Sequence, residues 1–315
     1  MKKVFITGIS GFAGSHLLDF LKNNKELEIY GTVWGSEKIN SAQTFRLDLR
    51  DKEKVFALLN EINPDYVFHL AALTSPAASF SHPEETLVNN VSAQFSLLEA
   101  LQKIKSQAKI LIVGSGDEYG LVNSKDNPIK ESQPLMPTSP YAVSKVTQDF
   151  LGLQYYLSYN LPIIRVRPFN HIGPRQSPHF VVSSFAKQIA EIESGKKEAV
   201  MRVGNLSAIR DFTDVEDMVK AYWLAVNKGV SGEVYNIGSG AARTTEGILS
   251  DLLSLSSKKI RISVDQSLMR PVDNPKLVCD FTKFQKLTGW KPAISFSETL
   301  QKILAFWREK IKEDV

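Results

Sequence analysis

The residues best suited to chemistry are a serine, a tyrosine and a lysine near the middle of the chain. Tyr141 and Lys145 are four residues apart in a stretch with a helical pattern, so both side chains are expected on one face of a helix. An ammonium group beside a phenol favours the phenolate, and the pair therefore predicts a lowered pKa for Tyr141 that suits proton transfer. Ser115 follows an apolar run of strand length, at the strand end where open α/β sheets bind their ligands. Its hydroxyl is expected to hydrogen-bond the same substrate oxygen that Tyr141 protonates.

The segment at residues 7–14, TGISGFAG, has the glycine spacing of a loop that binds a dinucleotide. It comes directly after the first apolar run and opens the first helical stretch. Glycines at such a turn let the backbone approach a pyrophosphate, whose charge meets the free amides and the positive dipole end of the helix. The residues expected to contact the cofactor here are Gly8, Gly11, Phe12, Ala13 and Gly14.

Two further strand ends are expected to line the cofactor. Asp48, followed by Leu49, can bind an adenine amine, although a helix cap explains an aspartate there equally well. The small residues that follow the strand near 66–70 permit close approach of the backbone. The residues expected to contact the cofactor at that end are Leu70, Ala71 and Ala72.

The loop after the second strand leaves the choice between NADP(H) and NAD(H) open. An NAD site usually has an acidic residue at the end of this strand, and neither Asp nor Glu stands at that end here. Ser36 and Lys38 can contact the 2′-phosphate of NADP, whereas Glu37 can serve NAD. A solvated loop explains the same three residues equally well.

The elements that position these residues alternate between strand and helix. Apolar runs of strand length lie at 4–7, 29–33, 66–70, 110–113 and 163–166, and helical stretches lie at 12–24, 51–62, 84–105 and 140–159. This alternation predicts an α/β fold with a doubly wound parallel sheet of the Rossmann type in residues 1–167. Residues 168–315 are predicted to form mainly a smaller C-terminal substrate-binding lobe, with a final helix near 295–312 and some segments returning to the first domain.

Composition excludes several classes of protein. The chain has 315 residues, of which 43% are hydrophobic, and this is ordinary globular usage and not that of a disordered chain. The net charge of +4 is interspersed, without the basic block of a nucleic-acid-binding arm. No apolar run approaches the length of a membrane span. The single cysteine, Cys279, cannot form an internal disulfide, so a cytoplasmic location is expected. No metal site is predicted.

The order of the glycine loop, Ser115, Tyr141 and Lys145 resembles the short-chain dehydrogenase/reductase superfamily, in its extended branch that acts on nucleotide sugars. Further matches are Asn90-Val91, Tyr119-Gly120, Ser139-Pro140-Tyr141 and the sequence TGWKP at 288–292. The resemblance implies hydride exchange at a nicotinamide, with Tyr141 as the acid/base. It implies that Lys145 binds the nicotinamide ribose and tunes Tyr141, and that Ser115 orients the sugar oxygen.

Two segments of the second half are similar to the subgroup of GDP-mannose dehydratases and GDP-4-keto-6-deoxy-mannose reductases. These are RPFNHIGPRQ at 167–176 and GNLSAIRDF at 204–212. The similarity implies that Arg210 and Arg270 bind the phosphates of the sugar nucleotide, which suits the forked guanidinium. It also implies a ribose contact for Asp273, a diphosphate or sugar contact for Asn170 and a position near the base for Lys187. Ordinary structural roles stay open for these residues, such as an ion pair between Arg210 and Asp211.

The turn after Ser115 favours reduction over dehydration. A 4,6-dehydratase needs acid/base groups beside the hydride site, and dehydratases of this subgroup have a glutamate at the position of Asp117. Gly116 can transfer no proton, and Asp117 is expected to contact the substrate. The resemblance thus implies NAD(P)H-dependent reduction of the C4 ketone of GDP-4-keto-6-deoxy-D-mannose to a GDP-6-deoxyhexose, with GDP-D-rhamnose expected. The alternatives are a GDP-mannose 4,6-dehydratase, another nucleotide-sugar 4-epimerase, and a catalytically silent dinucleotide-binding sensor.

The resemblance also implies a homodimer in which each chain contributes two helices, those near 84–105 and 140–159. Apolar residues on these helices are expected to supply the contact surface: Leu97, Leu98, Leu101, Phe150, Leu151 and Tyr155. The alternative is that they pack on the sheet of their own chain.

Overall fold

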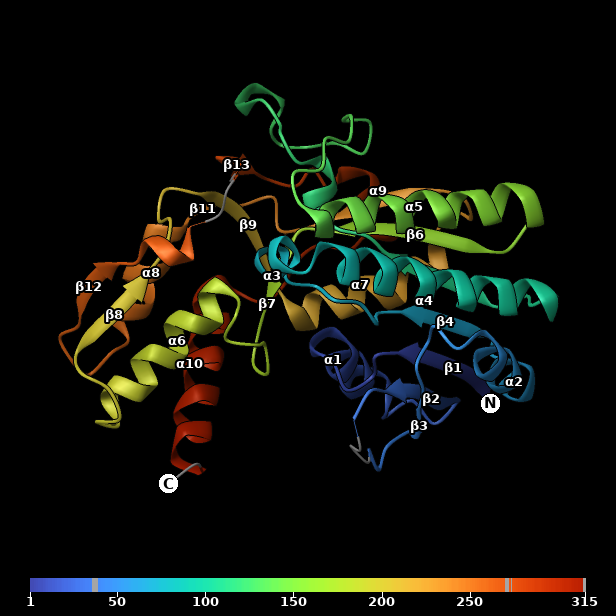
Figure 1. Cartoon of the computed structure of the whole chain (residues 1–315), viewed down its shortest axis with the longest axis horizontal. Coiled ribbons are helices and arrows are strands. Elements are labelled where there is room, and N and C mark those ends of the chain that lie inside the picture. Colours follow the sequence, from blue (N-terminus) through green and yellow to red (C-terminus); the bar gives the residue numbers. More distant parts are fainter. Residues whose placement is uncertain (36–38, 270–271, 273, 314–315) are drawn as a thin grey trace.

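A seven-stranded parallel sheet forms the centre of the molecule in the computed structural model, which describes residues 1–35, 39–269, 272 and 274–313 (Figure 1). Its strand order is β10-β6-β5-β4-β1-β2-β3, and every neighbouring pair runs parallel. The strands are β1 (Lys2–Thr7), β2 (Leu27–Val33), β3 (Gln43–Arg46), β4 (Tyr66–His69), β5 (Lys109–Val113), β6 (Ile163–Pro168) and β10 (Val234–Ile237). The predicted doubly wound α/β fold is confirmed.

Helices cover both faces of this sheet because its strands are apolar on both sides. Val4 and Ile6 of β1 are buried against one helical layer, and Phe5 between them is buried against the other. The first layer consists of α1 (Phe12–Leu21), α7 (Val215–Lys228) and α9 (Thr282–Thr288). The second consists of α2 (Lys52–Ile62), α4 (Pro83–Lys103) and α5 (Pro140–Tyr159), with the short α3 (Pro76–Ser81) packed against α4 and α5.

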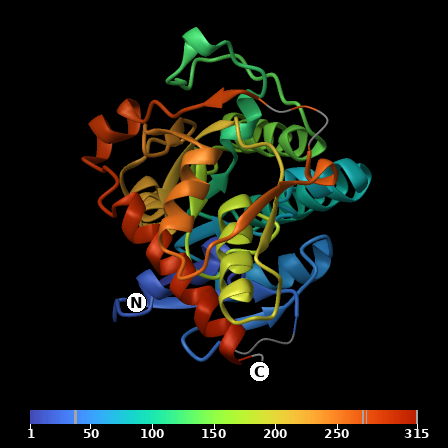
Figure 2. The ribbon, with the colours of Figure 1, turned by 90° about the vertical axis from the view of Figure 1, so that its left-hand side faces the viewer.

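A smaller lobe lies beside the large sheet, at the left of Figure 1 and facing the viewer in Figure 2. Its strands are β7 (Asn170–Ile172), β8 (Val200–Val203), β9 (Ile209–Asp214), β11 (Ala242–Thr244), β12 (Arg261–Val264) and β13 (Lys276–Leu277). Its helices α6 (Val181–Glu193), α8 (Thr245–Ser254) and α10 (Phe296–Glu313) enclose a separate apolar core. The chain returns to the large sheet with α7 and β10 between segments of this lobe.

Several apolar residues of α4 and α5 that were expected on an exposed contact surface are buried inside the chain. Leu97, Leu98 and Leu101 are 0% exposed and pack on the sheet of their own chain, so the prediction that they form a contact surface is wrong. Tyr155 is buried in the same core. The face of α4 that carries these leucines is the one turned toward β4 and β5, and helical spacing alone cannot tell which face that is.

No helix in the described ranges is long and apolar enough to cross a membrane.

Candidate active site

Ser115, Tyr141 and Lys145 meet at the carboxyl end of β5. Ser115 follows β5 and caps a short 3₁₀ turn (Gly116–Tyr119), with its hydroxyl accepting from the amide of Asp117 at 3.1 Å. Ser139 caps α5 by accepting from the amide of Ala142, so the helix begins beside Ser115. A side-chain hydrogen bond joins Ser115 and Tyr141. Lys145 lies one turn further along α5, and its Nζ donates to the carbonyl of Val113 at 2.8 Å.

Burial dominates the electrostatics of this group. Tyr141 and Lys145 are 7% and 5% exposed. Burial raises the pKa of Tyr141, and the charge of Asp117 raises it further, whereas the Ser115 hydrogen bond lowers it. Burial lowers the pKa of Lys145 to about 8, against the opposing charge of Glu118. The net shift of the Tyr141 pKa is therefore upward in this structure, opposite in direction to the lowering expected from Lys145, because loss of solvent around the phenol is its largest cause.

A phenol with a raised pKa is protonated at neutral pH. Tyr141 can then act as the acid that delivers a proton to an oxygen held by Ser115. This is the protonation state that a reduction requires, because the oxygen gains a proton as the carbon gains a hydride.

The glycine loop forms a close-packed turn between β1 and α1. Gly8 has a φ of 67°, and a Cβ there would lie 3.0 Å from the Cα of Ala71. A Cβ on Gly14 would overlap the carbonyl oxygen of Gly8. Gly11 at the N-cap offers no side-chain hydrogen bond, and no acidic residue lies in the first turn of α1. The amides of Phe12 and Ala13 therefore face an open end, and the loop fits the pyrophosphate of a dinucleotide.

The end of β4 is tied to this loop. The hydroxyl of Thr7 accepts from the amides of Leu70 and Ala71 at 3.0 and 3.1 Å. Leu70, Ala71 and Ala72 are half-buried, so they line the same region as the glycine loop. The neighbouring ring of His69 is buried and lies 3.0 Å from the Thr7 hydroxyl.

Asp48 lies after β3, and in this structure it binds Arg50. Its carboxylate accepts from Nε and Nη2 of Arg50 at 3.0 and 2.7 Å, and Leu49 beside it is buried. Asp48 does not cap α2, because Asp51 accepts from the amide of Lys54 there. An adenine contact by Asp48 stays a prediction. The prediction that Ser36, Glu37 and Lys38 select the cofactor lies outside the described residues.

Neighbouring strands of the smaller lobe carry two of the predicted substrate residues. Asn170 on β7 pairs with Phe212 on β9, and its Nδ2 donates to the carbonyl of Asp211 at 3.1 Å. Arg210 on β9 is half-buried and donates to the carbonyl of Asn274 at 2.6 Å. Asp117 is half-buried beside Tyr141.

The remaining predicted substrate residues have other positions. The Nζ of Lys187 on α6 lies 3.7 Å from Glu191 and 5.5 Å from the ring centre of Trp307 on α10. These contacts place the Lys187 side chain between α6 and α10. The predictions for Arg270 and Asp273 lie outside the described residues.

The segment between β6 and α6 joins the two lobes beside the glycine loop. The ring of His171 stacks on Phe12 with centroids 5.7 Å apart, and Arg175 forms an ion pair with Asp19 at 2.7 Å. The helix that follows the glycine loop therefore contacts the segment that carries Asn170.

Sequence reasoning missed a buried charged cluster directly beneath Ser115 and Lys145. It comprises Glu118, Asp149, Arg165 and Arg167, none more than 6% exposed. One signal was available, because Asp149 continues the four-residue spacing of Tyr141 and Lys145 along α5.

Comparisons with known proteins agree with this architecture. The profile of the GDP-mannose 4,6 dehydratase family matches residues 5–303. The GDP-6-deoxy-D-mannose reductase of Pseudomonas aeruginosa is 33% identical over 313 residues, which cover 99% of each chain. The structure of RMD from Pseudomonas aeruginosa in complex with NADPH has a TM-score of 0.88 at 32% identity, covering 98% of this chain and 100% of that one. A UDP-glucose 4-epimerase from Thermotoga maritima, solved with UDP-glucose, has a TM-score of 0.87 at 28% identity, covering 98% and 99%.

Proposed function

Because the chain belongs to the GDP-mannose 4,6-dehydratase family of extended short-chain dehydrogenases/reductases, we propose that it reduces the C4 ketone of GDP-4-keto-6-deoxy-D-mannose. It is an oxidoreductase that uses a nicotinamide dinucleotide and acts on a nucleotide sugar. The proposed product is a GDP-6-deoxyhexose, GDP-D-rhamnose, with NADPH or NADH as the reductant.

The close packing around Gly116 is the observation that favours reduction over dehydration. A Cβ at this position would lie 3.1–3.2 Å from three carbons of the Phe169 ring, which is 3% exposed. A longer acid or hydroxyl side chain would have to displace that ring. Dehydration needs additional proton carriers beside the hydride site, and the turn offers Asp117 alone between Ser115 and the buried Glu118.

The residues of the site divide the work of the reduction. The nicotinamide supplies the hydride when it is bound. Ser115 orients the C4 oxygen by a hydrogen bond, and protonated Tyr141 donates its proton to that oxygen as negative charge develops on it. Lys145, charged below a pH of about 8, is proposed to bind the nicotinamide ribose and to favour re-protonation of Tyr141. Arg210 and Asn170 are proposed to hold the diphosphate or the sugar from β9 and β7.

The test is consumption of NADPH or NADH with GDP-4-keto-6-deoxy-D-mannose. We expect stoichiometric loss of the reduced cofactor in the wild type and a loss of about 100-fold or more in kcat for Tyr141→Phe, because only the hydroxyl is removed. Tyr159→Phe, on the exposed end of the same helix, is the matched control and should keep full activity. Conversion of GDP-mannose to a keto sugar without added reductant would identify a dehydratase instead, and an unchanged rate in Tyr141→Phe would contradict the mechanism.

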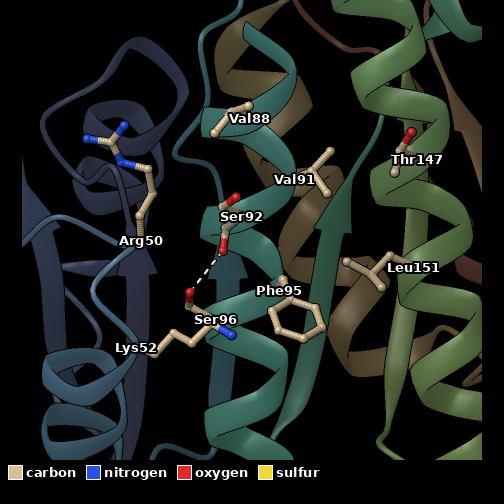
Figure 3. Close-up of a pocket in the computed structure, with 9 residues that line it drawn as sticks. All are labelled: Arg50, Lys52, Val88, Val91, Ser92, Phe95, Ser96, Thr147 and Leu151. Carbon is tan, nitrogen blue, oxygen red and sulfur yellow. Dashed lines mark hydrogen bonds between the residues drawn. The ribbon is translucent and has the colours of Figure 1, made fainter. Parts of the chain in front are cut away.

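We further propose that the chain forms a homodimer through α4 and α5 and works in the reducing cytoplasm. A pocket of about 410 Å³ lies at this face. In Figure 3, Val91 and Phe95 of α4 lie toward Leu151 of α5, and Val88 lies on the other side of α4, toward Arg50. Phe150 on α5 is 52% exposed. Apolar surface of this kind supports burial against a second copy. Cys279 is buried and free, which suits a reducing compartment.

A further inference from the structure

Glu118 is an ionisable side chain with no access to solvent, and burial together with the charge of Asp149 raises its pKa to about 8, against the opposing charge of Arg167. It is 0% exposed, although it lies in a polar turn directly after the candidate active-site serine. Burying an unpaired carboxylate costs free energy, so the contacts of Glu118 indicate its role.

Each carboxylate oxygen of Glu118 has a separate partner. Oε1 accepts from the amide of Ser115 at 2.7 Å and so fixes the backbone of the serine itself. Oε2 lies 3.0 Å from Nε of Arg167 on β6, an ion-pair contact without a hydrogen bond, because that Nε donates to Asp149. Glu118 thus links the turn that carries Ser115 to the neighbouring strand of the sheet.

Arg167 continues this link to α5. Its guanidinium donates to Asp149 through Nε at 3.0 Å and through Nη2. Arg165 donates to the other oxygen of Asp149 at 2.8 Å. Asp149 lies four residues after Lys145 and eight after Tyr141, so one face of α5 carries all three.

The backbone beside the cluster is shaped around the Glu118 carboxylate. A Cβ on Gly114 would overlap Oε1 of Glu118 and lie 3.1 Å from the carbonyl oxygen of Val166. Gly114 leaves the space that this carboxylate occupies. Replacing a buried ion pair by apolar residues is often neutral or stabilising, so stability alone is a weak reason for the cluster.

We propose that Glu118 is a positioning residue for the reaction: through Arg167 and Asp149 its carboxylate fixes Ser115 relative to Tyr141 and Lys145. This proposal rests on the roles given to these three residues in the proposed function. Glu118 touches neither substrate nor cofactor in this scheme, so its loss should lower kcat and leave the KM for the sugar nucleotide unchanged.

Two conservative variants separate the effect of the Glu118 charge from the effect of the position of its carboxylate. Glu118→Gln keeps the shape and the acceptor for the Ser115 amide but removes the charge. Glu118→Asp keeps the charge, and its shorter side chain cannot hold both partners. We expect each to lower kcat about tenfold, since small misplacements of reacting groups have large effects on rate.

The pH profile distinguishes positioning from general structural support. The charged groups that act on Tyr141 are Asp117 and Glu118 from the turn, and Tyr222 of α7 is a further titratable neighbour. Glu118 acts on Lys145, and Lys145 in turn lowers the pKa of the buried His69. The negative charge of Glu118 raises the pKa of Lys145, which burial has lowered to about 8, so removing that charge favours the neutral amine at lower pH. In Glu118→Gln the basic limb of the kcat profile should move to lower pH by roughly half to one unit, and in Glu118→Asp it should stay in place.

The control is Glu193→Gln, which breaks the ion pair between Glu193 and Arg308 at 2.7 Å in the smaller lobe. It should leave kcat and the basic limb unchanged. Folded Glu118 variants with wild-type kcat and an unmoved limb would overturn the proposal. Should Glu118→Gln fail to fold, Glu118→Asp alone provides the test. A wild type that does not reduce the keto sugar overturns the proposed reaction instead, and the same comparison is then made on the nucleotide sugar that the wild type converts.

Discussion

At the scale of single residues, the burial that accompanies the proposed catalytic role of Lys145 has a cost in stability. Burial lowers its pKa to about 8 from 10.5, so the folded protein holds a charge that burial disfavours at pH 7. We expect Lys145→Met to abolish reduction and to raise the free energy of unfolding at pH 7 by roughly 1–3 kcal/mol. Urea unfolding of both proteins at pH 7 measures the difference.

The sign of the pH dependence follows from the same shift. Between about pH 8 and 10.5 folded wild type has released the Lys145 proton while the unfolded chain retains it, so wild-type stability rises with pH in this window. The advantage of Lys145→Met should therefore shrink toward pH 10.5. Lys103→Met, on the exposed side of α4, should show neither effect. A Met variant less stable than the wild type at pH 7 would show that the contacts of the ammonium outweigh its burial.

At the scale of elements, the β1–α1 turn depends on close packing at Gly14. A Cβ there would overlap the carbonyl oxygen of Gly8 and lie 2.9 Å from the Cα of Ile9. We expect Gly14→Ala to raise the Kd for NADPH by about tenfold or more, because the helix end must move away from the loop. Gly152→Ala in α5 is the matched control, since its nearest atoms are side-chain carbons at 3.3–3.6 Å. Equal NADPH titrations for the two variants would contradict this account of the loop.

The elements that sequence reasoning located are those with a strong apolar period. The helix expected at 51–62 begins at Lys52, with Asp51 as its N-cap, and the one expected at 140–159 has those bounds. The strand β10 was missed because its four residues follow the break in the alternating pattern. Glu118 was missed as a buried group because a charged residue in a polar turn is normally solvated, and its partner Arg167 is 49 positions away in sequence.

At the scale of the whole molecule, the sheet and the smaller lobe each supply part of the proposed site. The carboxyl ends of the parallel strands carry the glycine loop and Ser115, which is where open α/β sheets bind ligands. The stacked rings of Phe12 and His171 hold the smaller lobe against that edge. All of these groups come from one chain, so the proposed homodimer would pair complete sites and would not share one.

This arrangement predicts that dimerisation and chemistry are separable. Phe150 on α5 is 52% exposed near the pocket between α4 and α5, and a charge there would be buried unpaired in a dimer. We expect the wild type to sediment as a dimer and Phe150→Lys to shift toward monomer, because a stable interface must bury on the order of 1,000 Å² of well-packed surface. Val264→Lys, 57% exposed on β12 of the smaller lobe, is the matched control and should leave the dimer intact. A monomeric wild type would overturn the proposed dimer, and a Phe150→Lys dimer would exclude this face. Monomeric Phe150→Lys should still reduce the keto sugar, since Ser115, Tyr141 and Lys145 lie on the opposite side of α5 from the exposed ring.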